Sequence, residues 1–194
     1  MLITEKFKNT SIILASSSPR RKQLLTSLDL EFQVQTKDTP EDFSDQMPIV
    51  EVPMFLACRK AEAFLQEIQE EHLVIAADTI VSIENIILNK PQNEEEAFSM
   101  LQMLSGKMHE VITGVCLMNK QKTFVFSDIT KVFFKTLTEE EIRYYIQKYA
   151  PYDKAGSYGA QEWLGMVAIH HIEGSYFNVM GLPIHRLYEE LVKF

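Results

Sequence analysis

The stretch IILASSSPRRKQLL, residues 12–25, decides the fold of this chain. Its apolar start predicts a buried strand over 11–16, its serines a tight loop, and its end a helix over 18–29. Ser18 is suited to the helix N-cap, because its hydroxyl can accept a hydrogen bond from an unpaired N–H of the first turn. Pro19 suits the first helical position, which needs no backbone donor. This stretch therefore predicts a strand–loop–helix unit.

The same turn has the features of an anion-binding site. The free N–H groups of a helix N-terminus and the positive end of its dipole attract anions. Arg20, Arg21 and Lys22 add cations at this positive end, where they cost stability unless an anion such as a phosphate chain offsets the repulsion. We therefore predict that Ser16, Arg20 and Arg21 bind an anionic substrate. A solvated basic turn is the alternative that the local pattern leaves open.

Length and charge limit the class of protein. The 194 residues suit one α/β domain spanning 1–194. Lys and Arg number 19 against 27 Asp and Glu, a formal charge of −8, which argues against a nucleic-acid partner. The N-terminus resembles no signal peptide and no apolar run approaches the ~20 residues that span a bilayer, so we expect a cytoplasmic protein without a membrane partner. Cys58 and Cys116 lack metal-ligand spacing and are expected to be reduced core thiols.

The remaining periodicities predict a mixed α/β fold, with a twisted mixed sheet flanked by helices, because short strands alternate with helices around one long antiparallel pair. The expected elements are a short strand 31–35, helix 53–69, strand 73–77, hairpin 80–83 and 86–88, helix 93–104, strands 108–118 and 123–137, helix 139–149, strand 167–172 and helix 182–192.

Two carboxylates stand out from the pattern. Asp78 follows the apolar strand LVIAA, and sites in open α/β sheets lie at the carboxyl ends of strands. A carboxylate there must be exposed, paired or metal-bound, because burying it bare is prohibitive. A turn cap is the alternative for Asp78. Glu41 lies in the acidic loop 37–48 and offers a hard oxygen ligand for Mg²⁺, with a solvated loop as its alternative.

Several further segments follow SSSPRR in a fixed order. They are AADTIV (76–81), NKP (89–91), LSGKMHEVITGV (104–115), DKAGSYGAQ (153–161) and IEGSYFNVMGLP (172–183). The series closely resembles the Maf family of nucleoside triphosphate pyrophosphatases from residue 11 to about 190, most of all the subgroup acting on dTTP and UTP. The resemblance implies an elongated, two-lobed Maf/ITPase-like fold with a central cleft.

The resemblance also implies catalytic roles. Asp78 would activate water and, with Glu41, would hold a divalent cation, Mg²⁺ or Mn²⁺. Lys60, in the family's KA dipeptide, and Lys90, in NKP, would neutralise charge as it develops on the phosphate. Many members have Glu where this chain has Asn89, so if that carboxylate helps to hold the metal, this site has a weaker ligand.

Base recognition would fall to two other positions. Thr79 occupies the place where the family sets substrate choice. Gln161 closes DKAGSYGAQ, and its carboxamide can donate and accept hydrogen bonds along a pyrimidine edge.

The predicted function is hydrolysis of dTTP and UTP, and of non-canonical pyrimidine nucleotides, to the monophosphate and pyrophosphate. Two alternatives stay open: a nucleotide-binding regulator of septum formation without significant turnover, and the 7-methyl-GTP pyrophosphatase subgroup, against which Thr79 and Gln161 weigh. The apolar stretches 80–88 and 123–134 could supply a homodimer surface or belong to the core.

Overall fold

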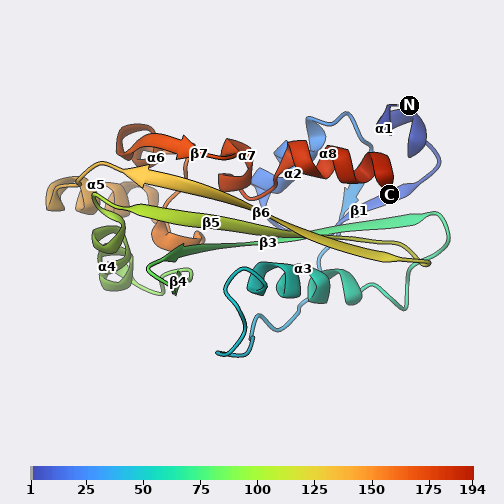
Figure 1. Ribbon diagram of the computed structural model, residues 1–194, viewed down its shortest axis with the longest axis horizontal. Coiled ribbons are helices and arrows are strands. Elements are labelled where there is room, and N and C mark those ends of the chain that lie inside the picture. The colour runs from blue at the N-terminus through green and yellow to red at the C-terminus, as the bar shows by residue number, and fades with distance from the viewer. Residues whose placement is uncertain (1) are drawn as a thin grey trace. The chain divides into compact units, whose positions relative to one another are not determined.

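A computed structural model describes residues 2–194 and has a seven-stranded mixed sheet with helices on its faces (Figure 1), which confirms the predicted fold class. The strand order is β2-β1-β3-β5-β6-β7, with β4 paired to β3. The strands are β1 Ser11–Leu14, β2 Phe32–Val34, β3 His72–Ile83, β4 Ile86–Leu88, β5 Met108–Met118, β6 Thr123–Phe134 and β7 Ile169–Glu173. The helices are α1 Ile3–Lys6, α2 Pro19–Thr26, α3 Val52–Glu62, α4 Glu94–Leu104, α5 Glu139–Tyr149, the 3-10 turn η1 Ala155–Ser157, α6 Trp163–Ala168, α7 Tyr176–Val179 and α8 Ile184–Lys193.

The predicted strand–loop–helix unit forms around β1. This strand pairs in parallel with both neighbours, so that Ile12 lies opposite Phe32 of β2 and Leu73 of β3. The Ser18 hydroxyl accepts the N–H of Arg21 at 3.5 Å and caps α2 as expected. Because β1 ends at Leu14, the loop that follows starts at the carboxyl end of the parallel strands.

The chain forms two compact units. The first contains residues 1–78, 113–128 and 181–194, and the second contains 79–112 and 129–180. In the first unit α3 lies on one side of the strands and α2 and α8 on the other (Figure 1). Its core joins α3 to the strands through buried side chains that include Ala57, Ala61, Val74, Ala76 and Cys116.

The second unit has its own core under α4 and α5. The hairpin β3–β4 contributes Val81, Ile83 and Leu88, so the apolar stretch 80–88 belongs largely to this core. Thr138 and Glu141 form a capping box at the start of α5. The inner face of α5 buries Tyr145 completely.

Several predicted boundaries were wrong. The helix expected over 53–69 ends at Glu62, and i→i+3 turns continue it, with the Phe64 N–H bonded to the Ala61 carbonyl at 3.0 Å. The strand expected to stop at 77 runs through Asp78 to Ile83 without a break. Residues 167–168, expected in a strand, end the unpredicted helix α6. Across residues 2–194, no helix combines the length and apolarity needed to cross a bilayer.

Candidate active site

The turn between β1 and α2 gathers the predicted anion-binding residues. Ser16 is buried, and its hydroxyl accepts the Arg21 Nη1–H at 3.2 Å and the Ser18 N–H at 3.3 Å. The Arg21 Nε–H also donates to the Gly181 carbonyl at 2.8 Å, which ties the turn to the start of the last segment of this unit. The turn is therefore an ordered part of the unit, with its cationic side chain held in place.

Electrostatics links Arg21 to the predicted carboxylates. Burial lowers the pKa of the Arg21 guanidinium, the negative charges of Asp78 and Glu41 act to raise that pKa, and the positive charge of Arg20 acts to lower it. The charges of Asp78, Glu41 and Arg20 thus all act on Arg21 within the first unit. The positive charge of Arg21 therefore lies close enough to the negative charges of Asp78 and Glu41 to interact with both.

Asp78 lies within β3, beyond Ile75, the last residue that pairs with β1. It therefore stands past the end of the parallel pair, as predicted, although its own strand continues. The Asp78 carboxylate is mostly buried and contacts the Lys60 ammonium, with Oδ1 2.5 Å from Nζ. The Glu41 Oε1 lies 2.9 Å from the same nitrogen. A turn-cap role for Asp78 is thus wrong, and the pairing expected of a buried carboxylate is present.

Arg59 is a site residue that the sequence pattern missed. Its Nη1 donates to the Pro40 carbonyl at 3.0 Å, and to the Asp42 carbonyl and carboxylate at 2.9 Å. These bonds attach the acidic loop to α3 on both sides of Glu41. Because the partners are carbonyls some 17 to 19 residues away, only a three-dimensional structure could reveal them.

The chemistry of the donors fits a magnesium or manganese ion. Glu41 and Asp78 each direct a carboxylate oxygen at one shared cationic group. Mg²⁺ in nucleotide enzymes commonly takes one or two carboxylates and completes its shell with phosphate oxygens and water. Within residues 2–194, no cluster of three or more His, Cys, Asp or Glu side chains offers an all-protein cage. The pair therefore fits an ion that substrate phosphates would help to bind.

The remaining predicted site residues belong to the second unit. Thr79 follows Asp78 on β3 and is half-buried, whereas Lys90 follows β4 and is exposed. Gln161 lies in the segment 153–162 and is half-buried, but its Oε1 is fully enclosed. No hydrogen-bond donor among the described residues reaches that oxygen. A buried acceptor without a donor costs ~1–3 kcal/mol, which binding a donor would recover.

The segment 153–162 is anchored inside the second unit. The buried Tyr158 hydroxyl lies 2.7 Å from Nε2 of His109, and burial lowers the pKa of His109 to about 3, so this imidazole is neutral. Lys154 is buried and pairs with Asp153 at 2.6 Å and with Glu162 at 3.2 Å. Lys154 is thus not a surface charge. The sequence missed Tyr145, whose hydroxyl also holds this segment.

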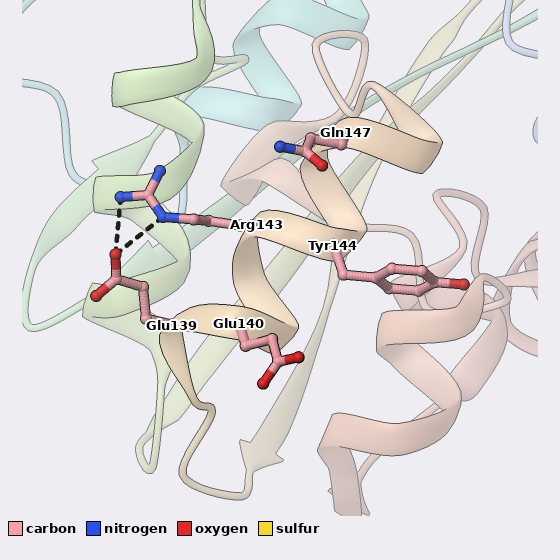
Figure 2. Close-up of a pocket in the computed structure, with 5 residues that line it drawn as sticks. All are labelled: Glu139, Glu140, Arg143, Tyr144 and Gln147. Atoms are coloured by element: carbon pink, nitrogen blue, oxygen red, sulfur yellow. Dashed lines mark hydrogen bonds and ion pairs between the residues drawn. The ribbon is translucent and has the colours of Figure 1, made fainter.

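A pocket on the outer face of α5 contains none of the predicted site residues. Figure 2 shows Arg143 and Tyr144 pointing to opposite sides of the helix. The Arg143 guanidinium pairs with Glu139 at 2.8 Å, and Glu140 adds a second carboxylate. The carboxylates would repel a triphosphate, so the candidate site is not assigned to this pocket.

Known proteins match the chain over nearly its whole length. The family model described as Maf-like protein matches residues 11–194. A dTTP/UTP pyrophosphatase of Phocaeicola vulgatus is 50% identical over 190 residues, covering 97% of each chain. One of Flavobacterium johnsoniae is 48% identical over 190 residues, covering 98% of each.

A solved structure adds support for the fold alone. The Staphylococcus aureus Ham1 protein superposes with a TM-score of 0.53 at 15% identity, covering 95% of this chain and 99% of that one. The motif order from SSSPRR to GLP, the matched span and the identity to these relatives agree with one another. The chain belongs to the Maf-like protein family.

Proposed function

We propose that this protein hydrolyses dTTP and UTP to the nucleoside monophosphate and pyrophosphate. The observation that carries the proposal is the Asp78–Lys60–Glu41 cluster, which lies in the same unit as the cationic turn at Arg20 and Arg21. A carboxylate base and several cations are what attack on a phosphorus atom requires. The names of the relatives, dTTP/UTP pyrophosphatase, support the choice of substrate.

In the proposed reaction Asp78 accepts a proton from water as the water oxygen forms a bond to the α-phosphorus. The bond between this phosphorus and the oxygen bridging to the β-phosphate breaks, and pyrophosphate leaves with the electron pair. Lys60, Lys90 and the two arginines stabilise negative charge on the phosphate oxygens. A divalent cation held by Glu41 and Asp78 would supply further charge neutralisation.

The proposed selectivity for the base rests on Gln161. Its enclosed Oε1 is an acceptor without a donor among residues 2–194. Uracil and thymine present an N–H at N3, whereas cytosine presents an acceptor there. An N3–H would satisfy the oxygen, and a cytosine would leave two acceptors facing each other. We infer that Gln161 selects uracil and thymine, with Thr79 bordering the base.

Release of pyrophosphate from a panel of nucleotides tests the function. The panel contains dTTP, UTP, CTP, ATP, GTP and 7-methyl-GTP, each with Mg²⁺ or Mn²⁺ and again with EDTA. We expect dTTP and UTP to be cleaved fastest and EDTA to stop turnover. Binding of nucleotide without pyrophosphate release would favour the regulator instead. Preference for 7-methyl-GTP would favour that subgroup.

The proposal extends to location and partners. We propose a cytoplasmic enzyme that takes free nucleotides and not polynucleotides, in keeping with the formal charge of −8. A homodimer remains part of the proposal through the stretch 123–134, where Phe124 and Ile129 are exposed. Light scattering on the purified protein measures its oligomeric state.

A further inference from the structure

Tyr145 connects α5 to both sides of Gln161. Its side chain is fully buried, and its hydroxyl donates a short hydrogen bond to Oε2 of Glu162. The same hydroxyl accepts the backbone N–H of Gly159 at 3.1 Å. One phenol therefore holds the chain two residues before Gln161 and one residue after it.

The protonation of Tyr145 suits this role. Burial raises the pKa of the phenol, and the hydrogen bond and negative charge of Glu162 raise it further. The hydroxyl therefore stays protonated at physiological pH and can always donate to the carboxylate. A hydrogen bond to a charged acceptor is stronger than a neutral one.

Glu162 is held from its other oxygen as well. Its Oε1 lies 3.2 Å from Nζ of Lys154, whose side chain is only 8% exposed, and that ammonium also contacts Asp153 at 2.6 Å. The carboxylate thus joins both ends of the segment 153–162 to Tyr145. Loss of either partner would leave a partly buried charge with fewer hydrogen bonds.

The backbone around Gln161 has little room to shift. A Cβ built on Gly159 would lie 2.9 Å from Cδ of Glu162, and one on Gly165 would lie 2.2 Å from the Ala160 carbonyl oxygen. The chain therefore packs against its own next turn on both sides of Gln161. These contacts fix the position of the Gln161 amide group.

We propose that Tyr145 is a positioning residue for base selection: through Gly159 and Glu162 it sets where the Gln161 amide lies. The inference rests on the proposed function, in which Gln161 reads the pyrimidine. Tyr145 touches no substrate in this account. It acts through the carboxylate and the backbone that it holds.

Tyr145→Phe tests this, because it removes one oxygen and keeps the ring that stacks on Tyr149 at 5.1 Å. We expect kcat/KM for UTP and dTTP to fall roughly tenfold, mainly through KM, and kcat/KM for CTP to change little. Tyr149→Phe is the matched control, with the same atom removed from the adjacent ring. It should keep the wild-type preference for UTP over CTP.

A double-mutant cycle separates positioning from a general loss of stability. If Tyr145 acts through Gln161, Tyr145→Phe should cost little further UTP selectivity in a Gln161→Ala background. Melting temperatures of all variants are measured alongside, since a purely structural role would lower them without changing the UTP-to-CTP ratio. Additive losses of selectivity in the cycle would overturn the proposal.

Glu162 supplies a second test should Tyr145→Phe fail to fold. Glu162→Gln keeps an acceptor for the phenol and should retain most of the UTP preference, whereas Glu162→Ala should lose it. Equal preference in both variants would overturn the proposal. A wild-type protein that cleaves neither UTP nor dTTP would instead overturn the proposed function, so the two failures are distinguishable.

Discussion

In the first unit the charged site residues are one another's partners, whereas in the second unit Gln161 has an enclosed oxygen that accepts no hydrogen bond from a described residue. The Lys60 ammonium bridges two carboxylates, so these side chains can exchange partners when phosphates arrive. The chain around Gln161 is held by two hydrogen bonds of Tyr145 that do not involve the Gln161 amide. Under the proposed function, this difference distinguishes groups that would respond to charge developing on the phosphate from a group that would have to be in place beforehand to read a base.

Removing the proposed base should have the largest effect on the first unit. Asp78→Asn keeps the shape of the side chain and the Lys60–Glu41 ion pair, but it cannot accept a proton from water. We expect turnover of dTTP to fall by about 10²–10⁴-fold. Nucleotide affinity, measured by calorimetry with an α,β-imido analogue, should survive. Near-wild-type turnover would remove Asp78 from its assigned role.

Two lysines in the first unit allow a matched test of the cluster. The ammonium groups of Lys60 and Lys37 each lie 2.5 Å from a carboxylate oxygen, of Asp78 and Glu67 respectively. Lys60→Met should lower kcat by roughly 10²–10³-fold, because a positive charge near the phosphate is lost. Lys37→Met removes the same charge and should leave kcat within about twofold, since Lys37 has no part in the cluster. An equal loss of kcat in both variants would mean that the Asp78–Lys60–Glu41 cluster has no particular role in turnover.

Gln161→Ala tests the opposite property of the second unit. It should lower kcat/KM for UTP and dTTP by roughly 10–100-fold, since a buried polar group of the base loses its partner. CTP and purine triphosphates should change little, so the variant becomes slow and less selective. Steady-state kinetics on the nucleotide panel provides the comparison. A uniform loss across all substrates would assign Gln161 to phosphate binding or to structure.

The smallest expected effect concerns the cationic turn. At about 100 times its Kd, the dTTP analogue should raise the wild-type Tm by roughly 5–10 °C. Arg20→Ala should show about half that shift at the same concentration, as a tenfold weaker Kd would give. Lys22 is exposed on the same turn, so Lys22→Ala is the matched control. We expect this control to show a nearly wild-type Tm shift. Identical shifts in all three proteins would favour the solvated basic turn.

Local signals predicted much of this molecule. The Ser18 cap arises from residues adjacent in sequence, and so does the hairpin turn, in which Glu84 and Asn85 both have positive φ. The end of β3 was mispredicted because Asp has low strand propensity, yet this Asp is paired with Lys60 while its apolar neighbours continue the strand. Helix α6 was missed because Gly165 weakens the helical pattern, although the same glycine permits close packing on Ala160.

The candidate site, like the fold, was predictable only in part. The residue types at 16, 20, 21, 41, 60 and 78 pointed to anion and cation chemistry, and the first unit brings them into one electrostatic cluster. The residues that hold them were not predictable: Arg59 reaches carbonyls of the acidic loop, and Tyr145 reaches Gly159 and Glu162. Such contacts join segments distant in sequence and leave no periodic signal.

The boundary between the two units falls within strand β3: Asp78 ends a segment of the first unit, and Thr79 begins the second unit. Side chains alternate between the two faces of a strand, so one inserted or deleted residue after Asp78 would turn every following side chain to the other face. Val81 and Ile83 would then leave the core that they help to form. Evolution and protein engineering can therefore change residue types along this strand far more readily than its length.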